Sequence, residues 1–388
     1  MINLLNAIFN GISIGSVLLI AALGLAIVFG LMGVINLAHG ELMMLGAYST
    51  FVVQNVFKTF GDPLFSTYIF FALPVAFIVA AIAGLILERG VIRFLYGRPL
   101  ETLLATWGVS LILRQFVRSV NGVLVIGIII FCLLFFGAYI FLKRSPDRDR
   151  IKSWFLGLIF AISAGIATTS GLLISQLGNT GLTRPWFSAR NVDVTAPEWL
   201  RGGILIGNIQ FPYSRVFIII LTVICLLGIY WFLNRSDWGL KIRSVTQNRT
   251  MSACLGIPTN QIDALTFALG SGLAGIAGCA ITLLGSVGPN TGQNYIVDAF
   301  IVVVVGGVGN LLGTVLAALG IGTINYLIGS GTLAVMSSSI DALQPLTDVF
   351  NFFATTSMAK VMVFALIIAF LQVKPSGIFP QKGRTAEL

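Results

Sequence analysis

Charged side chains are scarce in this chain of 388 residues, because Asp, Glu, Lys and Arg together make up only 10% of it. An average soluble domain carries about 25% charged residues. Hydrophobic residues reach 57%, which is more apolar surface than a water-soluble protein of this size can hide. The shortage of charge therefore excludes a disordered chain and a water-soluble enzyme. It predicts an all-α, polytopic transmembrane helical bundle.

Histidine and cysteine are also too few for the chemistry they usually serve. The single histidine, His39, cannot build a His-rich metal site. A disulfide framework is not expected, because three of the four cysteines lie in apolar runs and one in a basic loop: Cys132, Cys225, Cys254 and Cys279. The glycine-rich stretch 306–313 lacks the Lys-Ser/Thr pair of a phosphate-binding loop. We therefore expect no metal, no cofactor, no catalytic residue and no ATP hydrolysis by this chain itself.

The sequence contains many long apolar runs. A membrane-crossing helix needs about 20 apolar residues. The candidates are 9–35, 67–87, 122–142, 153–175, 216–233 and 264–287, with shorter or interrupted ones at 42–57, 102–120 and 350–373. Residues 299–340 carry no charge and suffice for two crossings with a turn at 306–310. We expect about eleven membrane helices, within a range of about 9–12, in one integral membrane domain over residues 1–388.

The positive charge indicates the orientation in the membrane. Of the 23 Lys and Arg residues, 15 lie in four short segments: 88–98, 143–152, 234–249 and 374–384. The positive-inside rule places these segments and the C-terminus in the cytoplasm. Counting crossings then places the N-terminus outside, as a retained membrane segment, and makes 176–214 an external loop.

Two stretches are predicted to be glycine-broken helices, because each holds glycines and an Asn between apolar runs. They are residues 29–41 and 305–313. Paired interruptions of this kind point to a transporter's central site, since unwound backbone at membrane depth is tolerated only along a cavity or inside protein. Glycine for close helix packing is the alternative. His39 and Glu41 belong to the first stretch, as a hydrolase pair, as gating groups or as structural residues.

The loop 234–261 is predicted to be a cytoplasmic coupling loop, and we call it the basic loop. Residues 239–255 can form one amphipathic helix with apolar contacts at Leu240, Val245, Met251 and Leu255 and wet basic residues at Lys241, Arg243 and Arg249. Gly256 supplies a helix stop, and Pro258 follows it. Such a helix docks into a partner's groove, or it simply connects two spans at the membrane interface.

Several motifs resemble a known family. Residues 30–41 read GLMGVINLAHGE, and 247–257 read QNRTMSACLGI; the glycine-rich 271–278 and 306–313 continue the pattern. They resemble the permease subunits of branched-chain amino acid type ABC importers. Residues 98–110, 191–200, 288–298 and 374–384 are more similar to the urea-transport branch of that family. The resemblance covers 1–120 and about 183–388. Residues 122–182 depart from it and are interpreted as an inserted helical hairpin.

The resemblance implies an ATP-driven importer in a bacterial cytoplasmic membrane, with this chain as the permease subunit. Its partners would be a second homologous permease subunit, two cytoplasmic ATPase subunits, a periplasmic solute-binding protein and membrane lipid, with no nucleic acid. Urea, a small neutral solute, is the expected substrate. The candidate path residues are Asn36, His39, Glu41, Thr106, Gln293 and Asn310. The candidate ATPase-coupling residues are Arg249, Met251, Ala253, Leu255, Gly256, Ile257 and Pro258.

Three other functions stay open from the sequence. A branched-chain amino acid permease would need charges or helix ends for a zwitterion. A passive channel for urea would have no use for a docking helix. A membrane-embedded hydrolase would depend on His39 and Glu41 alone.

Overall fold

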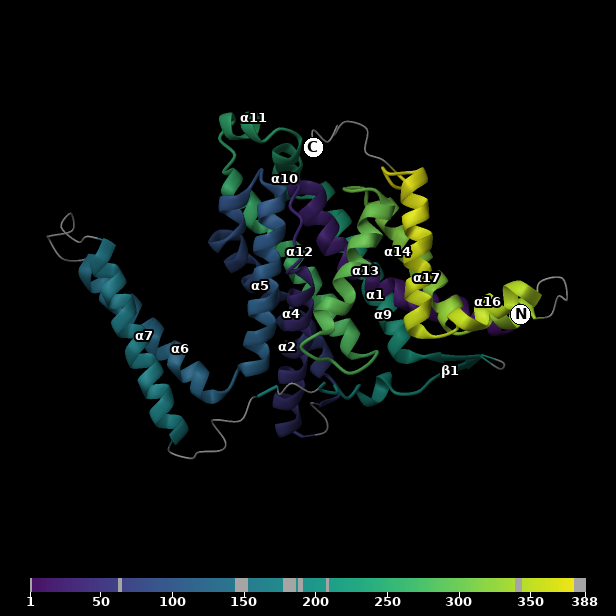
Figure 1. The fold of residues 1–388 in the computed structure, drawn as a ribbon, viewed down its shortest axis with the longest axis horizontal. Coiled ribbons are helices and arrows are strands. Elements are labelled where there is room, and N and C mark those ends of the chain that lie inside the picture. Colours follow the sequence, from purple (N-terminus) through teal and green to yellow (C-terminus); the bar gives the residue numbers. More distant parts are fainter. Residues whose placement is uncertain are drawn as a thin grey trace. The chain divides into compact units, whose positions relative to one another are not determined.

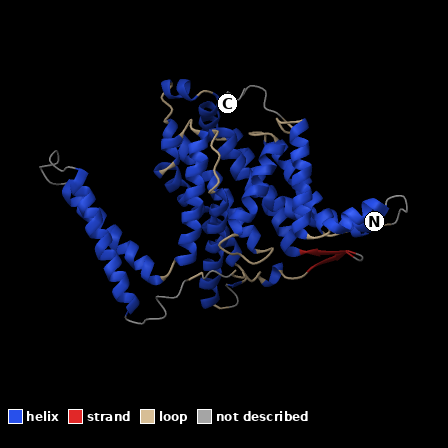
Figure 2. Cartoon of the chain, viewed as in Figure 1, coloured by secondary structure: helices blue, strands red, loops and turns tan. Residues whose placement is uncertain are grey.

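The computed structural model describes residues 2–61, 65–143, 153–176, 186–187, 191–206, 209–338 and 344–379. It divides into two compact units, one formed by Met1–Leu111 with Val192–Leu388 and the other by Ile112–Asn191. Figure 2 shows that the described part consists of helices, the loops that join them and one short antiparallel hairpin, β1 (Gly203–Ile206) and β2 (Ile209–Pro212). The structure thus confirms the helical membrane fold class.

The long helices follow the apolar runs of the sequence. They are α1 (Ile2–Met32), α2 (His39–Thr59), α4 (Tyr68–Gly90), α5 (Pro99–Ser119), α6 (Gly122–Lys143), α7 (Ser153–Gln176), α9 (Tyr213–Arg235), α12 (Thr259–Thr282), α13 (Thr291–Gly306), α14 (Leu311–Gly329) and α17 (Thr356–Val373). Shorter helices are η1 (Ile92–Leu95), α10 (Asp237–Gln247), α11 (Arg249–Cys254), η3 (Glu198–Leu200), α15 (Thr332–Ser337) and α16 (Gln344–Phe353). Among the described residues, 5 helices are long and apolar enough to cross a membrane, namely α1, α4, α9, α12 and α14.

Helix α12 packs closely against three neighbours in the first unit, and glycines make this possible. A Cβ atom at Gly275 would meet the Ala76 carbonyl oxygen of α4, and one at Gly278 would meet the Met43 carbonyl oxygen of α2. A Cβ atom at Gly24 of α1 would likewise meet the Gly270 carbonyl oxygen of α12. Small residues allow this approach because no side chain separates the helix backbones. The result is a closely packed group of α1, α2, α4 and α12.

One end of the first unit gathers the segments between α4 and α5 and between α9 and α12 (Figure 1). The Arg249 guanidinium of α11 lies 5.0 Å from the ring centre of Tyr96, which follows η1. At the opposite end, the Tyr68 hydroxyl donates to the Thr195 carbonyl at 2.9 Å, and the Trp199 indole N–H donates to the Ser66 carbonyl at 2.7 Å. Segments 88–98 and 234–249 therefore lie at one end and 192–201 at the other, as the count of crossings requires.

The second unit is built on the pair α6 and α7. Phe131 of α6 and Phe160 of α7 meet edge to face, with ring centres 5.3 Å apart. The Trp186 backbone N–H donates to the Val120 carbonyl at 2.9 Å. This pair corresponds to the predicted inserted hairpin. The basic segment 143–152 lies outside the described residues apart from Lys143, as do 177–185 of the predicted external loop and Lys382 and Arg384 of the tail.

Candidate functional site

The first glycine-broken stretch is an irregular segment inside the bundle. Helix α1 ends at Met32, Gly33 adopts a left-handed conformation with φ 69°, and α2 begins at His39. The His39 Nε2 lies 3.0 Å from the Ala21 carbonyl oxygen. Ala21 precedes the end of α1 by about 11 residues, which is about 16 Å at the rise of an α-helix. The chain therefore turns back alongside α1 over residues 33–39, and we call these residues, which include the first residue of α2, the first break.

Two polar groups of the first break are buried and have no hydrogen-bond partner among the described residues. Asn36 is 1% exposed, and its Oδ1 accepts from the Ala38 N–H at 3.0 Å, but its Nδ2 has no acceptor. His39 is 0% exposed; a proton on Nε2 is donated to Ala21, which leaves Nδ1 as a lone-pair acceptor with no donor. An unpaired buried polar group is costly. The first break thus offers one neutral donor and one neutral acceptor.

Helix α5 contributes two hydroxyl groups to the same place. The Thr106 Oγ1 accepts from the Leu37 N–H at 3.2 Å, and the Ser110 Oγ donates to Glu41 Oε1 at 3.0 Å. Thr106, Ser110 and Glu41 are all buried, at 0%, 5% and 1% exposed. The structure therefore brings predicted Asn36, His39, Glu41 and Thr106 together. Ser110 was not among the candidates, although its spacing of four from Thr106 puts both on one helix face.

The first turn of α13 meets the first turn of α2. A Cβ atom at Gly40 would meet the Gly292 carbonyl oxygen, and the reverse holds for Gly292. Two helix N-termini, each with its positive dipole end, thus converge beside the first break. Gln293 has an exposed side chain at this point, so the backbone of α13 and not this predicted amide packs on α2.

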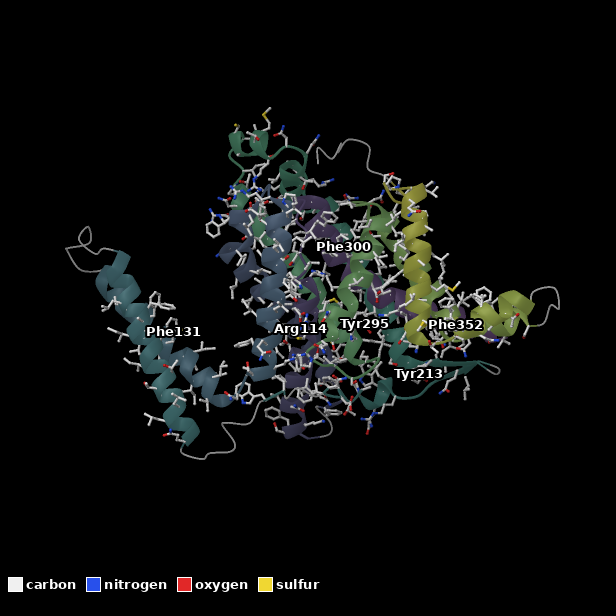
Figure 3. The ribbon with its side chains drawn as sticks, in the orientation of Figure 1. Arg114, Phe131, Tyr213, Tyr295, Phe300 and Phe352 are labelled. Carbon is white, nitrogen blue, oxygen red and sulfur yellow. The ribbon has the colours of Figure 1, made fainter. Side chains whose placement is uncertain are left out.

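The second glycine-broken stretch separates α13 from α14, and we call residues 307–310 the second break. Gly307 and Gly309 have φ of 98° and 84°. A Cβ atom at Gly30 would lie 2.6 Å from the Gly309 Cα, so the two stretches lie side by side. Phe29 stacks on Phe300 of α13 with ring centres 6.0 Å apart, and Figure 3 labels Phe300 there.

Asn310 and the C-terminal segment satisfy backbone groups around the second break. The Asn310 Oδ1 accepts from the Gly313 N–H at 3.2 Å and so caps α14. The Ile378 N–H donates to the Val305 carbonyl at 2.8 Å. Asn310 thus has a capping role in addition to its predicted place on the path.

The basic loop holds two helices, so the prediction of one helix over 239–255 was wrong. Helix α10 ends at Gln247 and α11 begins at Arg249, because Asn248 has extended backbone and its side chain accepts from the Met251 N–H at 2.9 Å. An Asn N-cap starts a new helix in this way. Gly256, with φ 81°, ends α11 as predicted, and the Ile257 N–H donates to the Ser252 carbonyl at 3.1 Å.

The apolar residues of the basic loop face two ways. Leu240, Met251 and Leu255 are 62%, 60% and 76% exposed, so the structure contradicts apolar contacts for them within this chain. Val245 is 8% exposed and packs with Ile242 against the start of α12, as predicted for Val245. Ala253 and Pro258 are also exposed. Leu240, Met251, Ala253 and Leu255 form an outward set that we call the loop face.

Comparison with known proteins gives a consistent family. The model of the family described as "Branched-chain amino acid transport system / permease component" matches residues 7–371. The high-affinity branched-chain amino acid transport system permease protein BraD of Pseudomonas aeruginosa is 24% identical over 380 residues, which are 96% of this chain and 95% of BraD. LivH of Escherichia coli is 24% identical over 378 residues, 96% of this chain and 94% of LivH. A probable LivH of Methanocaldococcus jannaschii is 25% identical, covering 94% of this chain and 88% of its own length. No solved structure matches the chain.

Proposed function

The chain belongs to the family of permease components of branched-chain amino acid transport systems, and from this premise we propose that it forms the solute path of an ATP-driven importer. The importer would combine this chain with a second homologous permease subunit, two ATPase subunits and a solute-binding protein. The chain itself would bind and gate the solute, and ATP hydrolysis would occur on the partner subunits.

The observation that carries the proposal is the convergence of α2 and α13 at Gly40 and Gly292, beside the first break. Transporters build central sites from the ends of discontinuous helices, because half-helix N-termini attract a substrate carboxylate. Glu41 already lies in the first turn of α2. The positive dipole end of α13, which has no acidic residue in its first turn, would then favour an anionic group.

A branched-chain amino acid fits this arrangement better than urea does. Its carboxylate would be attracted by the positive dipole end of α13 and held by the Asn36 Nδ2, and its ammonium would be held by the Glu41 carboxylate. Its apolar side chain needs a hydrophobic wall, and Ile296, about one turn along α13 from Gly292, offers one at the contact with Gly40. The named relatives are branched-chain amino acid permeases, which supports the same substrate class.

Urea is the second candidate, favoured by the neutral pair in the first break. Asn36 Nδ2 can donate to the urea carbonyl, and His39 Nδ1 can accept from a urea N–H. The motifs that resemble the urea-transport branch also favour it. A membrane hydrolase is disfavoured, because the named relatives are transport permeases.

The loop face is proposed as the ATPase contact. Leucine and methionine side chains exposed on a short loop helix suit insertion into a partner's groove. This role places the basic loop in the cytoplasm, in agreement with its positive charge. The opposite end, with residues 192–201, would then face the solute-binding protein, and the C-terminus would be cytoplasmic.

Uptake of labelled leucine and urea in a strain deleted for this chain tests the substrate proposal. We expect the deletion to abolish high-affinity leucine uptake, to leave urea uptake unchanged, and to be complemented by the wild-type chain. Loss of urea uptake alone would make urea the substrate. Normal uptake of both solutes would contradict the proposed function for these two classes.

A further inference from the structure

Arg249, the first residue of α11, turns toward the body of the first unit. Its Nη2 forms an ion pair with Asp263 Oδ2 at 2.6 Å, and the two side chains are 45% and 6% exposed. A buried carboxylate needs a partner, because an uncompensated buried charge is strongly destabilising. This ion pair therefore fixes α11 to the first turns of α12.

Tyr96 extends the contact from Arg249 to α4. The Arg249 guanidinium carbon lies 5.0 Å from the centre of the Tyr96 ring, and the Tyr96 hydroxyl donates to Glu88 Oε1 at 3.1 Å. Burial raises the pKa of Tyr96 above its ordinary value, with a further contribution from the nearby Asp263 charge. The phenol is therefore a protonated donor at physiological pH. Glu88 lies near the end of α4 and is 1% exposed.

The two helices that Arg249 joins pack against the first break, because Val34 and Ala38 share one buried cluster with Leu87 of α4 and Phe267 of α12. A Cβ atom at Gly84 of α4 would meet the Ser271 side chain of α12. A Cβ atom at Gly24 of α1 would meet the Gly270 carbonyl of α12 and would lie 2.9 Å from His39 Cε1. Packed backbones of this kind transmit small shifts instead of absorbing them. A movement of the start of α12 thus reaches His39.

We propose that Arg249 is the joint that transmits movement of the basic loop to α12 and α4, and through them to the first break. Arg249 is a positioning residue in this inference, since it touches neither solute nor ATP. The inference rests on the proposed function. It refines the sequence-based prediction, which named Arg249 only as one of the ATPase-coupling residues.

The test uses the complete complex of this chain with its permease and ATPase partners in proteoliposomes, with solute uptake and ATP hydrolysis measured together. We expect Arg249→Gln and Asp263→Asn to lower the solute imported per ATP hydrolysed by about tenfold, the size of a typical coupling between sites. ATP hydrolysis should continue in both. Arg243→Gln is the matched control, because Arg243 is exposed on the same loop and makes only a 3.5 Å contact with Asn234 Oδ1; its ratio should equal that of the wild type.

Two further variants separate transmission from folding. The exchange Arg249→Asp with Asp263→Arg should recover part of the ratio. If Arg249→Gln does not assemble, the ratio of solute imported to ATP hydrolysed is measured in Arg249→Lys. Lysine keeps the charge but loses the flat contact with Tyr96. A lowered ratio in an assembled Arg249→Lys or Asp263→Asn complex supports the joint, and a wild-type ratio in both overturns it.

The test separates a failure of the proposed function from a failure of the proposed role of Arg249. A wild-type complex with no ATP-driven uptake would refute the proposed function. A working wild-type complex with an unchanged ratio in Arg249→Gln would refute the joint alone.

Discussion

Replacing Gly40 by alanine probes the contact between α2 and α13 most sharply. The added Cβ would lie 2.8 Å from the Gly292 carbonyl carbon and 3.0 Å from the Ile296 Cβ, and it would come still closer to the Gly292 oxygen. Ordinary van der Waals contact begins at 3.4 Å. The neighbouring atoms are mainly backbone, so the two helix starts must separate.

The expected cost follows from overpacking, which destabilises well-packed cores by about 1–3 kcal/mol. The same displacement moves the N–H groups of α13 away from the first break. We therefore expect Gly40→Ala to lower the thermal midpoint of the purified chain. We also expect leucine uptake to fall by more than the loss of folded protein accounts for.

Gly320→Ala in α14 is the matched control. Nothing lies within 4 Å of a Cβ at Gly320, and the residue is helical. Alanine is favoured over glycine in a helix by about 0.5–1 kcal/mol, so this variant should be as stable as the wild type or more so. The assay is thermal unfolding in detergent followed by uptake per folded molecule. Equal stability and uptake in Gly40→Ala and Gly320→Ala would refute the contact between the two helix starts.

Three other predictions concern separate parts of the chain. Leu255→Glu on the loop face should abolish co-purification with the ATPase subunits while the chain stays folded; normal co-purification would contradict the docking surface. Lys360→Met should cost about 3 kcal/mol of unfolding free energy, because it strands the buried Asp298 that Lys360 contacts at 3.0 Å. Adding Asp298→Asn should recover most of that loss in the same melting assay, and a double variant no more stable than the single one would contradict the pair. Exposed Cys254 should react with an impermeant maleimide in inverted vesicles and not in intact spheroplasts, whereas buried Cys279 should react in neither; the reverse pattern would invert the proposed orientation.

The positions of the long helices and of their two interruptions were predictable from the sequence. The apolar runs predicted the positions of the long helices, because a span must be apolar over its whole length. The glycine and Asn clusters near residues 29–41 and 305–313 predicted both interruptions. The adjacency of the two interruptions was not predictable, since it depends on the contact of Gly30 with Gly309, far apart in the chain.

A local hydrogen bond explains the wrong prediction for the basic loop, and a distant partner explains the ion pair that was not predicted. The amphipathic pattern over 239–255 favoured a single helix, but the Asn248 side chain binds the Met251 N–H and starts a second one. Arg249 is exposed, as its place on the wet face predicted, but its ion pair was not predicted. Its partner Asp263 lies 14 positions further on in another helix, and no local pattern predicts that pair.

Accessibility of position 36 tests the central claim that the first break lies on the solute path. Asn36→Cys, in a chain with Cys254→Ala, is treated with a small thiol reagent in the assembled, transporting complex, and the rate of modification is measured. We predict that position 36 reacts, that leucine slows the reaction, and that urea does not; buried Cys279 should not react under the same conditions. An identical rate with and without leucine, in a complex that imports leucine, would contradict the account.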